Sequence, residues 1–291
     1  EWLDREIVLI YPSGFQANLA AVLALTDRHT PVICDRLIHH SLLVGVKASG
    51  AKLIRFKHNN LSELERLLKK SRQSNPQKQP LVITESLFSM EGTTAPIKEI
   101  SKLCIKYDSK LLIDEAHAFG VMGPEGRGES FGLKEPVSII SGTFGKAFGS
   151  GGAFLATDKI TGENLIQNCG AFRYTTALAP PLCASALAAL NLIQSNPSWG
   201  SELKEKAIAF RDRLSQLGWQ RPVGEGPIIS IILGSDELAI DCQKKLEAQG
   251  LLAVAIRPPT VPEGKSRLRL VIRRNTPVQA FERLIEVLKN K

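Results

Sequence analysis

The segment KLLIDEAH, residues Lys110–His117, decides the fold class of this chain. Its apolar run, residues 111–113, ends directly in the acid Asp114, and the histidine His117 follows three residues later. A short apolar run with an abrupt end is typical of a strand that is buried on both faces. In a parallel sheet, such a strand delivers the side chain at its carboxyl end to the edge where ligands bind. The simpler alternative is an acid that caps the next element beside a surface histidine.

Similar apolar runs lie on both sides of this segment and alternate with longer amphipathic stretches. This alternation predicts an α/β fold in which a mainly parallel sheet is sandwiched by helices. The expected strands are Glu6–Tyr11, Pro31–Asp35, Ala51–Phe56, Leu81–Glu85, Lys110–Asp114, Val137–Ser141 and Ala153–Ala156. The helices expected between them are Phe15–Leu25, His40–Ala48, Leu61–Ser71 and Ile97–Tyr107.

The pattern changes after an expected alanine-rich helix, Leu182–Gln194, where the sequence SNPSWG (Ser195–Gly200) interrupts it. We therefore expect a large domain at residues 1–197 and a small α+β domain at residues 198–291. The small domain is expected to begin with a helix. Its further expected elements are strand Ile228–Leu233, helix Glu237–Ala248, strands Leu252–Arg257 and Arg267–Ile272, and helix Pro277–Lys289.

Composition places the chain among ordinary globular proteins, with 43% hydrophobic and 23% charged residues in 291 positions. No apolar run is long enough to cross a membrane, and no secretory signal pattern opens the chain. The five cysteines are scattered and include no C-x-x-C pair, which favours reduced thiols in the cytoplasm over disulfides or a zinc site. The first methionine is Met90, so we expect that an N-terminal segment is missing before Glu1.

A second chemical motif follows another expected strand and reads SGTFGKAFGSGG, residues Ser141–Gly152. Its glycines allow close backbone approach to a ligand, and Lys146 is the single lysine within it. A lysine in an enclosed site can form a Schiff base with an aldehyde, whereas a lysine in an open loop is merely solvated. The spacings of a phosphate loop and of a dinucleotide fingerprint are both absent. An acid and a lysine at two strand ends fit pyridoxal phosphate (PLP), whose ring nitrogen needs a carboxylate and whose aldehyde needs a lysine.

Six segments in colinear order carry a family resemblance. They are SGFQAN (Ser13–Asn18), DRLIHHSL (Asp35–Leu42), TESLFSMEG (Thr84–Gly92), DEAHAFG (Asp114–Gly120), TFGKAFG (Thr143–Gly149) and RPPTVPEGKSRLRL (Arg257–Leu270). With these segments the chain resembles the α-oxoamine synthases, which are fold-type I PLP-dependent enzymes. The resemblance implies a PLP-binding large domain followed by a small C-terminal domain.

The resemblance also implies a role for particular residues. Lys146 would carry the cofactor as a Schiff base and act as general base, Asp114 would pair with the ring nitrogen, and His117 would bind the ring hydroxyl. His39 would stack on the ring and contact substrate, and Arg269 would bind the amino acid carboxylate. Further implied cofactor contacts are Gly14, Phe15, Ser89, Thr143 and Thr176, and a further implied substrate contact is Thr260.

Several of these assignments have competitors in the sequence. His40 adjoins His39, and only the spacing of the D-R-x-x-H motif favours His39. Arg267 and Arg269 share one face of an expected strand, so one of them is open to being an ordinary surface residue. Thr176 lies where a simple helix cap would also place a threonine, and Ser89 could merely cap a turn.

The resemblance implies a decarboxylative condensation between an amino acid and an acyl thioester. The segment RPPTVP (Arg257–Pro262) is the form associated with members that use L-alanine and a pimeloyl thioester, carried on coenzyme A or acyl carrier protein. Glycine or serine with a different acyl-CoA is the alternative. The family also implies a homodimer with its active site at the interface. We expect no nucleic acid partner, because the basic residues behind the net charge of +8 are dispersed among acids. We also expect no metal and no membrane partner, since the chain has no C-x-x-C pair and no apolar run that could span a bilayer.

Overall fold

The computed structural model describes residues 1–289, which form two compact units. Unit 1 contains Glu1–Phe88 and Ala95–Pro197. Unit 2 contains the short segment Ser89–Thr94 and the chain from Ser198 onward. None of the helices described over residues 1–289 combines the length and the apolar character needed to cross a membrane.

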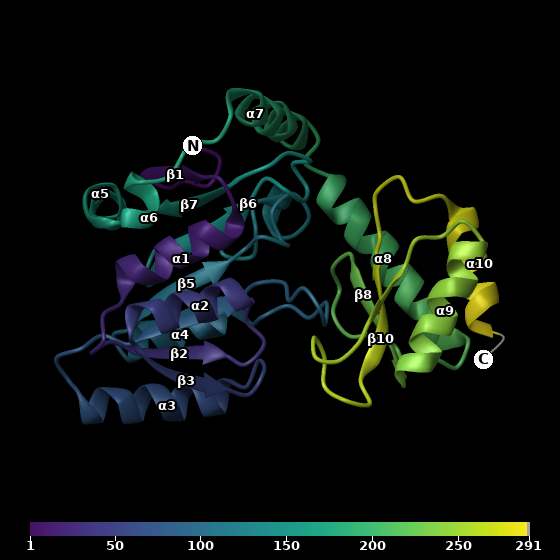
Figure 1. Ribbon diagram of the computed structural model, residues 1–291, viewed down its shortest axis with the longest axis horizontal. Helices are drawn as coiled ribbons and strands as arrows, with labels where there is room; N and C mark the ends of the chain where they lie inside the picture. The colour runs from purple at the N-terminus through teal and green to yellow at the C-terminus, as the bar shows by residue number, and fades with distance from the viewer. Residues whose placement is uncertain (290–291) are drawn as a thin grey trace. The chain divides into compact units, whose positions relative to one another are not determined.

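Unit 1 is built on a seven-stranded sheet with the order β1-β7-β6-β5-β4-β2-β3 (Figure 1). Pairings among β2, β3, β4, β5 and β6 are parallel, whereas β7 runs antiparallel to both β6 and β1. The strands are β1 (Ile7–Tyr11), β2 (Pro31–Asp35), β3 (Lys52–Phe56), β4 (Leu81–Glu85), β5 (Lys110–Asp114), β6 (Val137–Thr143) and β7 (Ala153–Thr157). The predicted α/β class with a mainly parallel sheet is confirmed.

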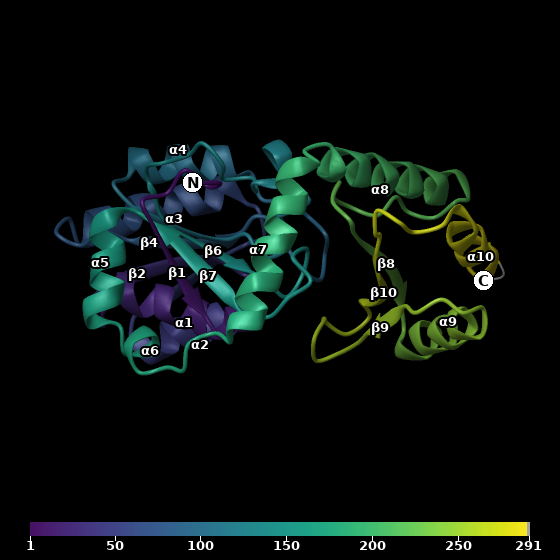
Figure 2. The ribbon, with the colours of Figure 1, turned by 90° about the horizontal axis from the view of Figure 1, so that it is seen from above.

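Both faces of this sheet are covered by helices, as Figure 2 shows for α1 and α2 on one side and α3 and α4 on the other. The helices are α1 (Gly14–Leu25), α2 (His40–Ser49), α3 (Leu61–Ser74), α4 (Ile97–Lys106), α5 (Lys159–Asn168), α6 (Gly170–Arg173) and α7 (Pro180–Ser195), with the 3-10 turn η1 (Pro124–Gly126). Successive strand residues point to opposite faces, so Leu112 packs in the α1–α2 layer and Leu111 and Ile113 pack in the other. This explains why the strand sequences read as continuous apolar runs.

Several element bounds in unit 1 differ from the sequence expectation by one to three residues, and two of its helices were not expected. Strand β6 continues two residues further than expected, because Gly142 and Thr143 still pair with Phe154 and Ala153 of β7. Helices α5 and α6 were not expected, and they extend the cover of α1 on its side of the sheet.

The carboxyl ends of β2, β4, β5 and β6 lie along one edge, because these strands are parallel. Three of these strands end in an acid, namely Asp35, Glu85 and Asp114. Glu85 and Asp114 are register partners across β4 and β5. Acids are rare in buried strands, so their presence at one edge marks it as a polar site in an otherwise apolar layer.

Unit 2 contains a three-stranded antiparallel sheet with the order β8-β10-β9. Its elements are α8 (Trp199–Gln216), β8 (Ile228–Gly234), α9 (Asp236–Ala248), β9 (Val254–Ile256), β10 (Ser266–Val271) and α10 (Val278–Lys289). Arg211 of α8 is fully buried and donates to the carbonyl oxygens of Ala207, Val223 and Ile228, which ties the helix to β8.

Candidate active site

Asp114 is the last residue of β5 and is only 5% exposed. One carboxylate oxygen, Oδ1, accepts from the backbone N–H of Ala116 at 2.9 Å. The other, Oδ2, accepts from Asn18 Nδ2 at 2.8 Å. Two donors therefore hold this carboxylate in one orientation at the carboxyl edge of the sheet.

A chain of hydrogen bonds continues from Asp114 to His39. Asn18 Nδ2 also donates to Ser41 Oγ at 2.9 Å, and Ser41 Oγ lies 2.7 Å from His39 Nδ1. We call these four residues, Asp114, Asn18, Ser41 and His39, the Asn18 chain. Its members come from β5, from the first turns of α1 and α2, and from the residue that caps α2.

Partial burial lowers the pKa of His39, and the positive charge of Lys146 lowers it further, while the negative charge of Asp114 acts in the opposite direction. Both Asp114 and Lys146 therefore lie close enough to His39 to act on its charge. His40 is the first residue of α2, and both histidines are exposed, but among the described residues 1–289 it is the His39 ring that is hydrogen-bonded to Ser41. The arrangement favours His39 over His40 as the histidine of the site.

The N-terminus of α1 adjoins the end of β6. Ser13 caps this helix by accepting from the backbone N–H of Gln16, and Gly14 and Phe15 form its first turn. A Cβ atom on Gly14 would lie 3.9 Å from Thr143 Oγ1, so the helix start and Thr143 are neighbours. The first amides of a helix have no partner within it and attract anions.

Lys146 lies on a tight loop between β6 and β7. The loop is closed by bonds from Phe144 N to Gly152 O and from Ser150 N to Phe144 O, both 2.9 Å. Gly149 has φ 57° and donates to Lys146 O at 3.0 Å, while Phe148 is buried. The loop backbone is therefore anchored on both sides of Lys146, whose side chain stays exposed.

Glu115 follows Asp114 and is fully buried. Its carboxylate accepts from the backbone N–H groups of Ser130 (2.7 Å) and Glu129 (3.2 Å) and from the hydroxyl of Ser86. Burial raises the pKa of this carboxyl group. Because Glu115 N also donates to Ser141 O at 2.8 Å, this residue joins the ends of β5 and β6 to the loop at residues 129–130.

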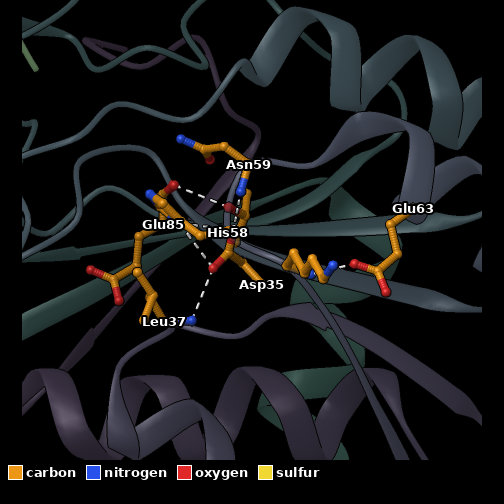
Figure 3. A network of polar contacts seen from close by, with 8 residues as sticks. Asp35, Leu37, His58, Asn59, Glu63 and Glu85 are labelled. Carbon is orange, nitrogen blue, oxygen red and sulfur yellow. Dashed lines mark hydrogen bonds and ion pairs between the residues drawn. The ribbon is translucent and has the colours of Figure 1, made fainter. Parts of the chain in front are cut away.

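Asp35, at the end of β2, anchors the segment that leads to His39. Its carboxylate is fully buried and accepts from the backbone N–H groups of Leu37 (2.9 Å) and Asn59 (2.8 Å), and it lies 3.1 Å from His58 Nδ1 (Figure 3). The His58 ring meets Phe88 edge to face at 4.4 Å. Neither Asp35 nor His58 was expected to have a role, although Asp35 stands at the end of an apolar run as Asp114 does.

Three predicted site residues belong to unit 2, and two of them meet there. Arg269 on β10 donates from Nε to the carbonyl oxygen of Ser89 at 2.6 Å. Thr260 lies in an exposed turn. Burial lowers the pKa of Arg269, and no carboxylate of the described residues lies within ion-pair distance of it. Arg267 differs, because it is buried and paired with Glu91 at 3.3 Å. Of the two arginines on this strand, Arg269 is thus the one whose guanidinium is not engaged in an ion pair with another of the described residues 1–289 and could bind an anionic ligand.

The last two predicted residues lie on connecting segments of unit 1. His117 lies in the turn after β5 and is half-buried. Thr176 is exposed in the segment before α7. Asn18 and Ser41 lie within quoted motifs but were assigned no role, because their contacts join residues far apart in the chain.

The residues of unit 1 fit PLP. Asp114 is a strand-end carboxylate with fixed orientation, Lys146 is an exposed amine on an anchored loop, and the start of α1 beside Thr143 offers backbone amides to a phosphate. Asn18 Oδ1 is buried without a hydrogen-bond partner in the part of the chain that the structure describes, so the site retains an unused polar atom. The combination of this sheet, its helices and these residues defines a fold-type I PLP-dependent enzyme.

Comparison with known proteins agrees with this class. The sequence model of aminotransferase class I and II matches residues 2–288. An 8-amino-7-oxononanoate synthase of Methylobacillus flagellatus is 38% identical over 283 residues, which are 97% of this chain and 70% of the relative. The crystal structure of 8-amino-7-oxononanoate synthase from Francisella tularensis has a TM-score of 0.86 at 29% identity, covering 99% of this chain and 83% of that one. A high-resolution structure of serine palmitoyltransferase (SPT) with PLP has a TM-score of 0.92 at 26% identity, covering 99% of this chain and 73% of that one.

The chain therefore belongs to the aminotransferase class I and II family and, within it, to the group of the 8-amino-7-oxononanoate synthases.

Proposed function

We propose that this chain is a PLP-dependent acyltransferase of biotin biosynthesis that condenses L-alanine with a pimeloyl thioester. The thioester is carried on coenzyme A or acyl carrier protein, and the products are 8-amino-7-oxononanoate, CO2 and a free thiol. The observation that carries the proposal is the buried Asp114 carboxylate, which Asn18 and Ala116 hold in place. Asn18 and Ser41 link it by hydrogen bonds to His39, on whose charge Lys146 also acts. The 38% identity to an 8-amino-7-oxononanoate synthase supports the choice of substrates.

Bound PLP supplies an electron-accepting ring that stabilises negative charge at the α-carbon of an amino acid. Asp114 Oδ atoms would accept a hydrogen bond from the ring nitrogen and keep that nitrogen protonated. Its two fixed donors, Asn18 and the Ala116 amide, prevent it from rotating away. His117 would bind the ring hydroxyl, and Gly14, Phe15 and Thr143 would hold the phosphate.

Lys146 would bind the cofactor as a Schiff base and, when released from it, take the proton from the α-carbon of L-alanine at Nζ. Arg269 would bind the alanine carboxylate through its guanidinium Nη atoms, because its Nε is committed to the Ser89 carbonyl. His39 would contact the cofactor ring and the substrate, and Thr260 the substrate. Ser89 and Thr176 would complete the cofactor contacts.

We further propose a cytoplasmic homodimer with the active site at the subunit interface. Its support is helix α7, where the side chains of Leu182, Leu187 and Leu192 are 38–58% exposed. In a monomer these apolar side chains would face water, and a second subunit would bury them. The five cysteines are free thiols, which fits a reducing compartment. The net charge of +8 would attract acidic coenzyme A or a carrier protein.

The experiment combines the protein with PLP, L-alanine and pimeloyl-CoA and measures thiol release together with the visible absorbance of bound cofactor. We expect thiol release that depends on both substrates. Lys146→Ala should abolish the release and change the cofactor absorbance, whereas Lys159→Ala, an exposed lysine on α5, should change neither. Unchanged absorbance in Lys146→Ala would refute the cofactor assignment.

A second candidate function is another α-oxoamine synthase that uses glycine or serine with a different acyl-CoA. The observation in its favour is the TM-score of 0.92 to SPT. Thiol release with serine and a long-chain acyl-CoA, but not with L-alanine and pimeloyl-CoA, would establish it in place of the first.

A further inference from the structure

The Asn18 chain has one possible direction of donation along its length. Asp114, as a carboxylate, only accepts, and the amide nitrogen of Asn18 carries two hydrogens. One hydrogen is donated to Asp114 Oδ2 at 2.8 Å and the other to Ser41 Oγ at 2.9 Å. Ser41 Oγ accepts in this bond, so its own single hydrogen is available for His39 Nδ1 at 2.7 Å.

The backbone of Ser41 leads to the same result. Its N–H group, which can only donate, also points at His39 Nδ1, at 3.3 Å. A ring nitrogen that receives two donors presents a lone pair to them, so the hydrogen of a neutral His39 ring is carried by Nε2. The geometry around Nδ1 is thus consistent from the side chain and from the backbone of one residue.

Burial keeps this arrangement from reversing. Asn18 and Ser41 are 3% and 0% exposed, so water does not compete for their hydrogen bonds. A flipped Asn18 amide would place its oxygen against the Asp114 carboxylate, and two acceptors in contact repel each other. The amide oxygen of Asn18 has no partner among residues 1–289, so nothing described here favours the flip.

We propose that Asn18 is a positioning residue that, through Ser41, fixes His39 as the Nε2–H tautomer while it orients Asp114. His39 then presents an N–H donor, and the group it recognises is an acceptor, namely a carboxylate or carbonyl oxygen of the substrate. This inference rests on the proposed function for the identity of the substrate, but not for the tautomer itself. Asn18 couples two residues of the site that come from separate elements of the sheet edge.

The test is nitrogen NMR of the histidine rings in the full chain, labelled with ¹⁵N-histidine and measured above the pH at which the rings are protonated. The chain has five histidines, and the His39 signals are assigned by their absence in His39→Gln. We expect the unsubstituted protein to show a pyridine-type Nδ1 and a pyrrole-type Nε2 for His39. A pyrrole-type Nδ1 would overturn the proposal directly, whatever the variants do.

Two variants test the Asn18 chain one hydrogen bond at a time. Ser41→Ala removes the hydroxyl donor and should increase the share of the Nδ1–H tautomer, with Asp114 still bound to Asn18. Asn18→Asp replaces the amide donor by an acceptor, so Ser41 should donate to it instead, and His39 Nδ1 should gain hydrogen. His39 signals identical to those of the unsubstituted protein in folded Ser41→Ala would overturn the proposal even if Asn18→Asp fails to fold.

Asn164→Ala is the matched control, because Asn164 is a half-buried asparagine whose amide donates to the far end of α1, at Ala24 O. It should leave the His39 signals unchanged, which separates positioning from a general effect on α1. In the thiol-release assay we expect Ser41→Ala to lower kcat/KM about tenfold, the worth of one hydrogen bond. Inactivity of the unsubstituted protein would refute the proposed function but leave the tautomer readable, so the two failures are distinguishable.

Discussion

Replacement of Glu115 by alanine tests the buried junction behind Asp114. The substitution removes the acceptor of two backbone N–H groups, at Glu129 and Ser130, that cannot turn to another partner as the Ser86 hydroxyl can. Each orphaned donor costs roughly 1–3 kcal/mol. Part of this cost is offset, because the raised pKa of Glu115 shows that burial of its charge is unfavourable. We therefore expect Glu115→Ala to lower the free energy of unfolding by about 2–4 kcal/mol.

The assay is urea unfolding followed by far-UV circular dichroism and by tryptophan fluorescence. Trp2, whose ring lies 6.0 Å from Phe119, is the tryptophan of unit 1 and reports on this unit. Glu99→Ala, which removes an exposed glutamate of α4, should change the free energy of unfolding by less than about 0.5 kcal/mol. If Glu115→Ala behaved like this control, Glu115 would not be the anchor of the loop at residues 129–130.

Three further results are expected. Arg269→Lys should raise the KM for L-alanine about tenfold in steady-state kinetics, because lysine lacks the planar fork that reaches a carboxylate while Nε holds Ser89; an unchanged KM would contradict this. Burial lowers the pKa of His39 in the folded protein, so the unfolded chain binds the proton more readily and stability is lost as the pH falls below about 6.5. In urea unfolding at several pH values, the free energy of unfolding should fall less steeply with decreasing pH in His39→Gln than in the unsubstituted protein, whereas His40→Gln should not change this slope. Equal slopes in His39→Gln and the unsubstituted protein would contradict the prediction. Asp35→Asn should lower the free energy of unfolding by roughly 1–3 kcal/mol in the same assay, since one amide oxygen replaces two carboxylate acceptors. An unchanged free energy of unfolding would exclude the anchoring role of Asp35.

Local pattern was enough to predict the sheet and its chemistry at the strand ends. The strands β2, β4 and β5 begin and end in the structure at the residues expected from the sequence, because strands buried on both faces read as nearly continuous apolar runs. Asp114 and Lys146 were visible for a related reason. An acid at the end of an apolar run and a lysine among glycines both interrupt a pattern that packing alone would continue.

What the sequence by itself determined is therefore the order of the elements, the strand-end position of Asp114, the loop that carries Lys146 and the family. The tertiary structure decided which donor meets which acceptor. Asn18 and Asp114 are 96 positions apart, and Asp35 and His58 are 23 apart. Hydrogen bonds act over about 3 Å, so such partners meet only when α1 packs on the sheet and β3 pairs with β2. The exclusion of water by that packing then gives the Asn18 chain a single direction, a property that no local pattern encodes.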